Sequence, residues 1–143
     1  MYPDEFEECQ GNVEVAPGVF IAQQDHKMFG FAYRTLVGND TEGQKHGYKL
    51  HLVYGAQAAP TEKGYATVND SPEAMALSWE VSTTPVEVPG YKPTATMVID
   101  STKTTKEKMA AIEAILYGSE SEEARLPLPA EVIEILKSEQ AAG

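Results

Sequence analysis

Between residues 28 and 99 the chain repeatedly alternates apolar and polar side chains, and this pattern constrains its fold more than any other feature. In the first such run, Phe29, Phe31 and Tyr33 share one face and the residues between them take the other. Since successive side chains of a strand point to opposite faces, each run predicts a strand with one apolar face. The predicted strands are residues 28–37, 48–54, 75–81 and 95–99, and Val19–Ala22 is a further candidate for an edge strand. We therefore expect an antiparallel sheet, or a sandwich of two such sheets.

The C-terminal part changes to a helical pattern. Thr104 with Glu107 three residues later is typical of a capping box. The helix that follows carries an apolar stripe and ends before Gly118, a residue type favoured just past a helix C-terminus. Pro129 suits the first position of a last, short helix that runs to about residue 139. The expected fold class is mainly β (α+β), with one flanking amphipathic helix and a short C-terminal helix.

The length of 143 residues suits one domain. We expect a single domain over 1–143, with an acidic irregular segment at 1–25, a β core at 26–100 and a helical region at 101–143. Two connections in the β core are long and polar, a hairpin loop from Gly38 to His46 and a less regular stretch from Gly55 to Pro72. A connection of the second kind tends to be functional or mobile.

The charge balance limits the partners of the chain. The net charge is −11, and residues 1–25 contain six acidic side chains without a Lys or Arg. Phosphate contacts need clustered Lys and Arg, so this composition argues against specific nucleic-acid binding. The apolar stretches are far shorter than the roughly 20 residues of a membrane helix, and no signal-peptide pattern is present. We expect no membrane association.

No motif of the sequence indicates catalysis, a cofactor or a metal. Glycine-rich phosphate loops and nucleophile elbows are missing, and the three histidines do not have the spacing of a zinc-protease helix. The one cysteine, Cys9, lies in an acidic segment that should weaken it as a nucleophile. The chain is therefore predicted not to be an enzyme, although Glu80, Asp100 and a histidine would be the groups of a small hydrolase if a cleft joined them.

Several segments together resemble the major tail protein, or tail tube protein, of long-tailed bacteriophages of Gram-positive hosts and their prophages. The resemblance extends from about Tyr2 to Leu136, and the segments that carry it include Gly47–Ala56, Val68–Ala74, Leu77–Glu80, Ser82–Val86, Ile99–Thr102, Leu116–Gly118 and Arg125–Pro129. Members of that family are usually longer at the N-terminus, so this chain is expected to lack some of their first strands.

The resemblance implies a structural virion protein that folds as an antiparallel β-sandwich or small β-barrel with a flanking helix. Six copies would form a ring, and rings would stack into a tube through which DNA passes as unbound cargo. The implied partners are further copies of the chain and other phage tail proteins, and the implied location is the phage tail, after synthesis in the host cytoplasm. Subunit interfaces are expected in the two polar connections, at Asn39, Asp40, Glu42, Gln57, Glu62, Lys63 and Tyr65.

A second interpretation is a carbohydrate- or receptor-binding β-sandwich module of a phage tail. This function would require exposed aromatic side chains on one surface. The candidates are Tyr54, Tyr65, Trp79 and Tyr91.

Overall fold

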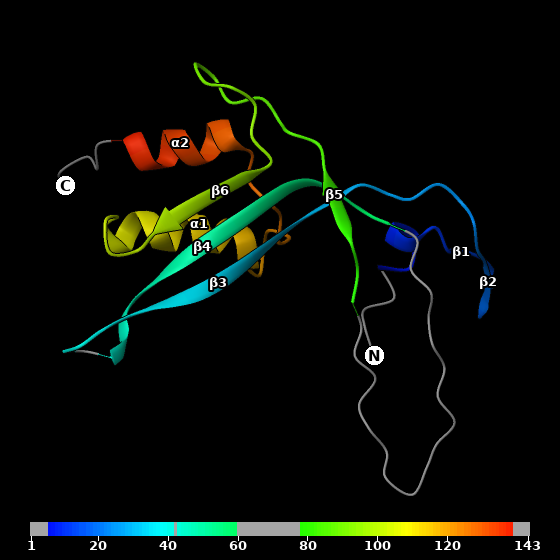
Figure 1. The fold of residues 1–143 in the computed structure, drawn as a ribbon, viewed down its shortest axis with the longest axis horizontal. Helices are drawn as coiled ribbons and strands as arrows, with labels where there is room; N and C mark the ends of the chain where they lie inside the picture. Colours follow the sequence, from blue (N-terminus) through cyan, green and yellow to red (C-terminus); the bar gives the residue numbers. More distant parts are fainter. Residues whose placement is uncertain (1–5, 42, 60–77, 139–143) are drawn as a thin grey trace, which may run out of the picture. The chain divides into compact units, whose positions relative to one another are not determined.

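The computed structural model describes residues 6–41, 43–59 and 78–138 of the chain (Figure 1). These residues belong to two compact units. The first comprises Met1–Phe29 with Ala56–Thr83, and the second comprises Gly30–Gly55 with Thr84–Gly143. No helix of the described part has the length and apolarity needed to cross a membrane.

The first unit contains short elements. A 3₁₀ turn, η2 (Glu8–Gln10), precedes a hairpin of β1 (Val13–Ala16) and β2 (Val19–Ile21), and Gly18 takes a φ of 76° in the turn between the two strands. The sequence predicted β2 but not β1. A third strand, β5 (Val81–Thr83), pairs with the last residues of β4 in the same unit.

Aromatic contacts hold this unit together. The ring of Phe6 lies edge-on to Phe29 and Trp79, with centroids 5.2 and 5.3 Å apart. The indole N–H of Trp79 also donates a hydrogen bond to Gln10 at 3.1 Å. Trp79 was expected within a strand at 75–81, but residues 78–80 have no regular structure and residues 75–77 lie outside the described part.

The second unit is built on antiparallel strands. They are β3 (Phe29–Asn39), β4 (Gly43–Ala58) and β6 (Thr96–Asp100), and the sheet order is β3-β4 with β6 on the other side of β4. The pairing of β4 with β6 runs from Lys49 opposite Asp100 to Val53 opposite Thr96. β4 is longer at both ends than the alternation predicted, and most of the loop expected over Gly38–His46 is therefore strand.

Two helices follow the sheet in the sequence. α1 (Lys106–Tyr117) begins at Thr105, whose hydroxyl accepts a hydrogen bond from the Lys108 N–H at 3.4 Å. The predicted cap at Thr104 is thus wrong by one residue. Gly118 ends α1 with a φ of 74°, and α2 (Pro129–Lys137) begins with the proline that the sequence indicated.

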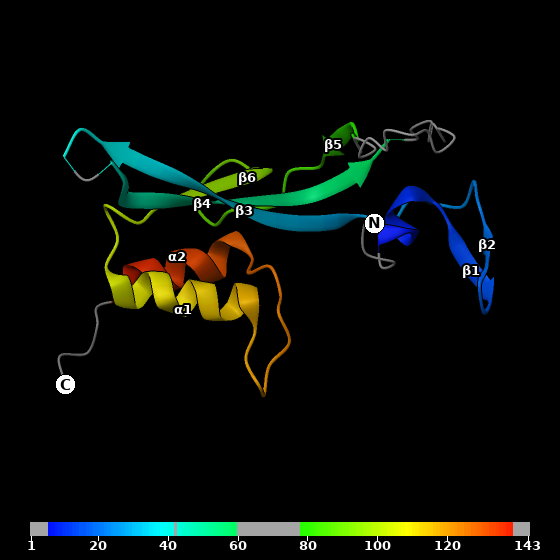
Figure 2. The same cartoon turned by 90° about the horizontal axis from the view of Figure 1, so that it is seen from below.

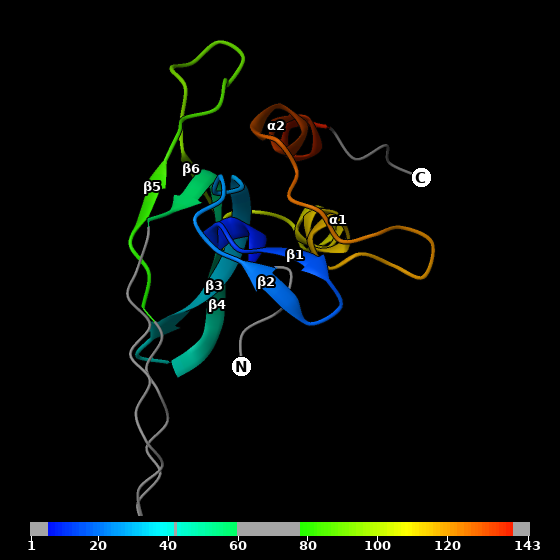
Figure 3. The ribbon, with the colours of Figure 1, turned by 90° about the vertical axis from the view of Figure 1, so that its right-hand side faces the viewer.

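Both helices lie on the same side of the sheet formed by β3, β4 and β6 (Figures 2 and 3). The core between these layers joins alternate residues of β4 to both helices, and its buried members are Leu50, Leu52, Tyr54, Ile99, Met109, Ile112 and Val132. Tyr54 is 3% exposed, and its hydroxyl donates to the Pro127 carbonyl at 2.8 Å. The mainly β, α+β class with antiparallel sheets and two short helices is confirmed, and the arrangement is sandwich-like.

Candidate self-association surface

β3 is the least covered strand of the second unit. Nine of its eleven residues are exposed and two are half-buried. One edge of β3 pairs with β4, and no strand of the described residues pairs with its other edge. An exposed edge of this length is a template for strand addition, and natural proteins usually protect such edges with Lys, Pro or a short strand. β3 contains neither Lys nor Pro.

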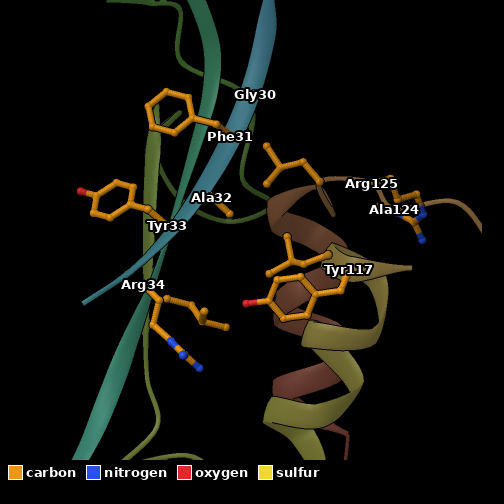
Figure 4. Close-up of a pocket in the computed structure, with 11 residues that line it drawn as sticks. Gly30, Phe31, Ala32, Tyr33, Arg34, Tyr117, Ala124 and Arg125 are labelled. Atoms are coloured by element: carbon orange, nitrogen blue, oxygen red, sulfur yellow. The ribbon is translucent and has the colours of Figure 1, made fainter. Parts of the chain in front are cut away.

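The side of β3 that faces away from the helices carries an aromatic row. Phe31 and Tyr33 are 39% and 48% exposed, and their centroids are 6.3 Å apart. Tyr33 stacks on His51 of β4 at 4.5 Å with parallel rings, and the His51 Nε2 lies 2.8 Å from the Thr35 hydroxyl. Figure 4 shows both rings on the side of β3 opposite to α1. The alternation thus predicted correctly that these two rings share a face, but the described residues leave that face partly exposed.

The helix-facing side of β3 borders a groove of about 320 Å³. Its walls are Ala32 and Arg34 on β3, Leu116 and Tyr117 on α1, and Leu126 of the segment that leads to α2 (Figure 4). At one end, the side chain of Leu126 lies where a Cβ on Gly30 would be. Ala32 presents only a methyl group between that end and Arg34, so the groove stays open.

A polar cluster fixes the other end of the groove. The Arg34 guanidinium lies 5.0 Å from the centroid of the Tyr48 ring, a cation–π distance. The Tyr48 hydroxyl donates to Glu113 of α1 at 2.7 Å. That hydrogen bond, together with desolvation and the charge of Glu113, raises the pKa of Tyr48 to about 12. The cluster therefore ties β3 and β4 to α1 and orients Arg34.

The opposite side of the same unit ends in a proline-rich turn beside β6. Val86 bridges Thr94, while the next residue, Ala95, accepts a hydrogen bond from Tyr54 of β4. The backbone groups of neighbouring strand residues point in opposite directions. Since Ala95 bonds to β4, Thr94 bonds to Val86 on the other side, so residues 86–94 extend away from β4. Tyr91, Val98 and Leu128 are the exposed large apolar residues there. β3 and this turn therefore lie on opposite sides of β4, each with exposed apolar side chains.

The predicted interface residues are only partly described. The Asn39 amide nitrogen at the end of β3 lies 3.0 Å from His46 Nδ1, and Asp40 is exposed in the turn that follows. Gln57 lies on β4 rather than in a connection, and its amide donates to the His26 carbonyl at 3.2 Å. Glu42, Glu62, Lys63 and Tyr65 lie outside the described residues.

The sequence analysis missed the surface around β3, and it named Tyr91 only as a candidate aromatic residue of a carbohydrate-binding module. Alternation shows that two faces of a strand differ but does not show which of them the chain covers. The exposure expected for Tyr91 agrees with its place among turn formers in Pro89-Gly90-Tyr91-Lys92-Pro93.

Side chains that could bind a metal do not cluster in the part of the chain that the structure describes. No three His, Cys, Asp or Glu side chains gather there as a metal site. Burial is the main cause that raises the pKa of the Cys9 thiol, which disfavours the thiolate. Comparison with known proteins found no matching family model, no matching curated protein and no matching solved structure.

Proposed function

We propose that this chain is a structural subunit of a bacteriophage tail tube that assembles with copies of itself, as the resemblance of its segments implies. The observation that carries the proposal is β3, an eleven-residue edge strand with exposed apolar side chains and no edge-protecting Lys or Pro. Such a strand is a hazard for a protein that stays monomeric. In an assembling protein the same strand supplies the backbone hydrogen bonds of the interface.

Exposed apolar residues on opposite sides of β4 support head-to-tail association. A contact between two different surfaces repeats from copy to copy, and it closes into a ring when the rotation per copy permits. Phe31, Tyr33 and Leu36 are 39%, 48% and 58% exposed, so burial of the remaining surface contributes roughly 1 kcal/mol for each. With strand pairing along β3, this gain offsets part of the cost of association. We propose rings of six copies that stack into a tube and join other phage tail proteins in the virion, after synthesis in the host cytoplasm.

The charge of the chain fits a conduit for DNA. The net charge of −11 gives phosphates no clustered cations to bind, so DNA would pass without being held. On this proposal the protein has no catalytic residue, and its function lies in the shape and charge of the assembly.

The carbohydrate-binding alternative receives less support. Tyr54, one of the aromatic residues it requires, is buried in the core with its hydroxyl bonded to Pro127. Trp79 is half-buried in the first unit, where it packs on Phe6. Two of the expected platform residues therefore stabilise the fold.

The test is the association state of the purified chain over a range of concentrations. Light scattering after gel filtration and negative-stain electron microscopy should show oligomers that grow with concentration, with rings or tubes that have a central hole. A chain that remains monomeric at every concentration would contradict the proposal.

A charge on β3 provides the matched variant. Leu36→Lys places an ammonium group at an exposed position of the free strand and should abolish or strongly weaken association. Val15→Lys makes the same charge change at a 56% exposed position of β1 and should associate as the wild type does. Circular dichroism of both variants checks that they fold.

A further inference from the structure

Tyr91 is the most exposed large apolar residue on the β6 side of the second unit, with 70% of its surface accessible. It ends the turn Val88-Pro89-Gly90-Tyr91, which is closed by a hydrogen bond from the Tyr91 N–H to the Val88 carbonyl at 3.0 Å. Proline at the second position and a glycine with a φ of 80° at the third are typical of a type II turn. Val88 is buried and anchors the turn to the unit.

This turn is preorganised to present an aromatic ring. Pro89 and Pro93 restrict the backbone on both sides of Tyr91, so little conformational entropy remains to be lost on docking. Tyrosine has few rotatable bonds and a large apolar body, which makes it a frequent anchor of protein interfaces. An exposed ring on a fixed turn therefore has the properties of an interface anchor.

The groove beside β3 has complementary properties. Ala32 leaves space between Leu126 at one end and Arg34 at the other, and the wall is completed by Leu116 of α1. A volume of about 320 Å³ is sufficient for one aromatic side chain. Tyr117 and Arg34 also line the groove, where they can contact a phenol hydroxyl or ring face.

The charges next to the two surfaces are opposite in sign. Lys92 follows Tyr91 directly and is exposed. The segment that precedes the groove wall at Ala124 carries the exposed carboxylates of Glu120, Glu122 and Glu123. A copy that inserted Tyr91 would bring Lys92 towards this acidic segment. Such complementarity favours the correct partner and orientation.

We propose that the groove between β3 and α1 receives Tyr91 of a second copy of this chain. Because groove and turn lie on opposite sides of β4, the contact joins unlike surfaces and repeats from copy to copy. This inference rests on the proposed self-association and specifies which surfaces meet.

The direct test is photo-crosslinking of the full chain with p-benzoylphenylalanine in place of Tyr91, which keeps an aromatic ring at the turn. Irradiation should give covalent dimers, and mass spectrometry should place the adduct in peptides that contain residues 30–34 or 116–126. The control has the same photoreactive residue in place of Phe20, which is 50% exposed on β2. Adducts that map elsewhere, or dimer yields no higher than in the control, would overturn the inference.

Two unlabelled variants test the same contact by affinity. Tyr91→Ala removes the anchor and Ala32→Leu fills the groove at an exposed position. Each should weaken association at least about tenfold in sedimentation experiments, as loss of an interface anchor does. If wild type assembles and both variants assemble equally well, this inference fails while the proposed function stands. If the wild type neither associates nor cross-links, both fail.

Discussion

Replacement of Tyr54 by phenylalanine tests the packing of the second unit in a way that depends on pH. The ring lies in the core at 3% exposure, and its hydroxyl donates to the Pro127 carbonyl at 2.8 Å. Tyr54→Phe keeps the ring and leaves that buried carbonyl without its donor. The cost is about 1–2 kcal/mol of the free energy of unfolding at pH 8.

At high pH the wild type becomes less stable than the Tyr54→Phe variant. Burial, with a smaller contribution from Glu131, raises the pKa of Tyr54 from 10.0 to about 12. Between these values the unfolded chain releases the phenol proton and the folded chain retains it, so the free energy of unfolding falls as the pH rises. Two pKa units correspond to a loss of about 2–3 kcal/mol, which the phenylalanine variant does not experience. The wild type should therefore lose its advantage above pH 10 and be the less stable protein near pH 12.

The assay is urea unfolding at pH 8, 10, 11 and 12, followed by the helical circular dichroism of α1 and α2, which belong to the same unit as Tyr54. At each pH the quantity to evaluate is the difference in the free energy of unfolding between wild type and variant, because all other groups titrate equally in both proteins. Tyr33→Phe, at an exposed ring, should leave the free energy of unfolding at pH 8 unchanged. A gap between wild type and Tyr54→Phe that stays constant from pH 8 to 12 would refute the assigned burial and hydrogen bond.

Three further substitutions test individual features of the second unit. Ile112→Ala empties a fully buried position of α1 and should cost about 2–5 kcal/mol in urea unfolding, and a loss below 1 kcal/mol would contradict the core assignment. Gly118→Ala places a Cβ against the Ala124 amide and the Glu122 carbonyl at a φ of 74°, so it should cost about 1–3 kcal/mol and reduce the helical signal of α1. Arg125→Gln removes a bidentate pair with Glu131 that is exposed to solvent, so it should leave the urea unfolding midpoint nearly unchanged, and any difference should shrink with added salt.

The elements that the sequence predicted are those governed by local stereochemistry. Gly118 and Pro129 delimit the helices because a positive φ and a missing N–H are properties of the residues themselves. The core positions of β4 followed in the same way from alternation, since Leu50 and Leu52 had to share one face.

Two errors of the sequence analysis concern the cap of α1 and the strand β1. Thr104 and Thr105 are equally suited to cap α1, and the extended backbone of Thr105 decides between them. β1 was missed because its four residues follow an acidic stretch. The Pro17-Gly18 dipeptide between two short runs rich in β-branched residues was a signal for the hairpin that the sequence analysis did not use.

The extent of β4 was also underestimated. Gly55 adopts a φ of 58° within the strand, and a Cβ there would collide with the Thr84 carbonyl. A glycine between apolar runs was interpreted as the start of a connection, whereas here it permits an irregularity through which the strand continues. Sequence alone does not distinguish these roles, because both require only that the residue be glycine.

The exposure of β3 links this comparison to the proposed function. Alternation in residues 28–37 predicted a strand with one apolar face, but the residues that the structure describes cover neither face of β3 well. The prediction and the structure agree if a second copy of the chain packs on the exposed apolar side chains of β3. Backbone amides on the edge of β3 that no described strand pairs with would then form hydrogen bonds to the second copy.

Hydrogen exchange distinguishes the two states directly. The amides of β3 that do not bond to β4 should exchange rapidly in dilute protein, since an exposed strand edge offers them no protection. In the assembled protein they should exchange at least about tenfold more slowly, whereas the amides of β1 and β2 should change little. Equal exchange of β3 in dilute and assembled protein would mean that copies meet through another surface. The exposed apolar side chains of β3 would then be without an explanation in self-association.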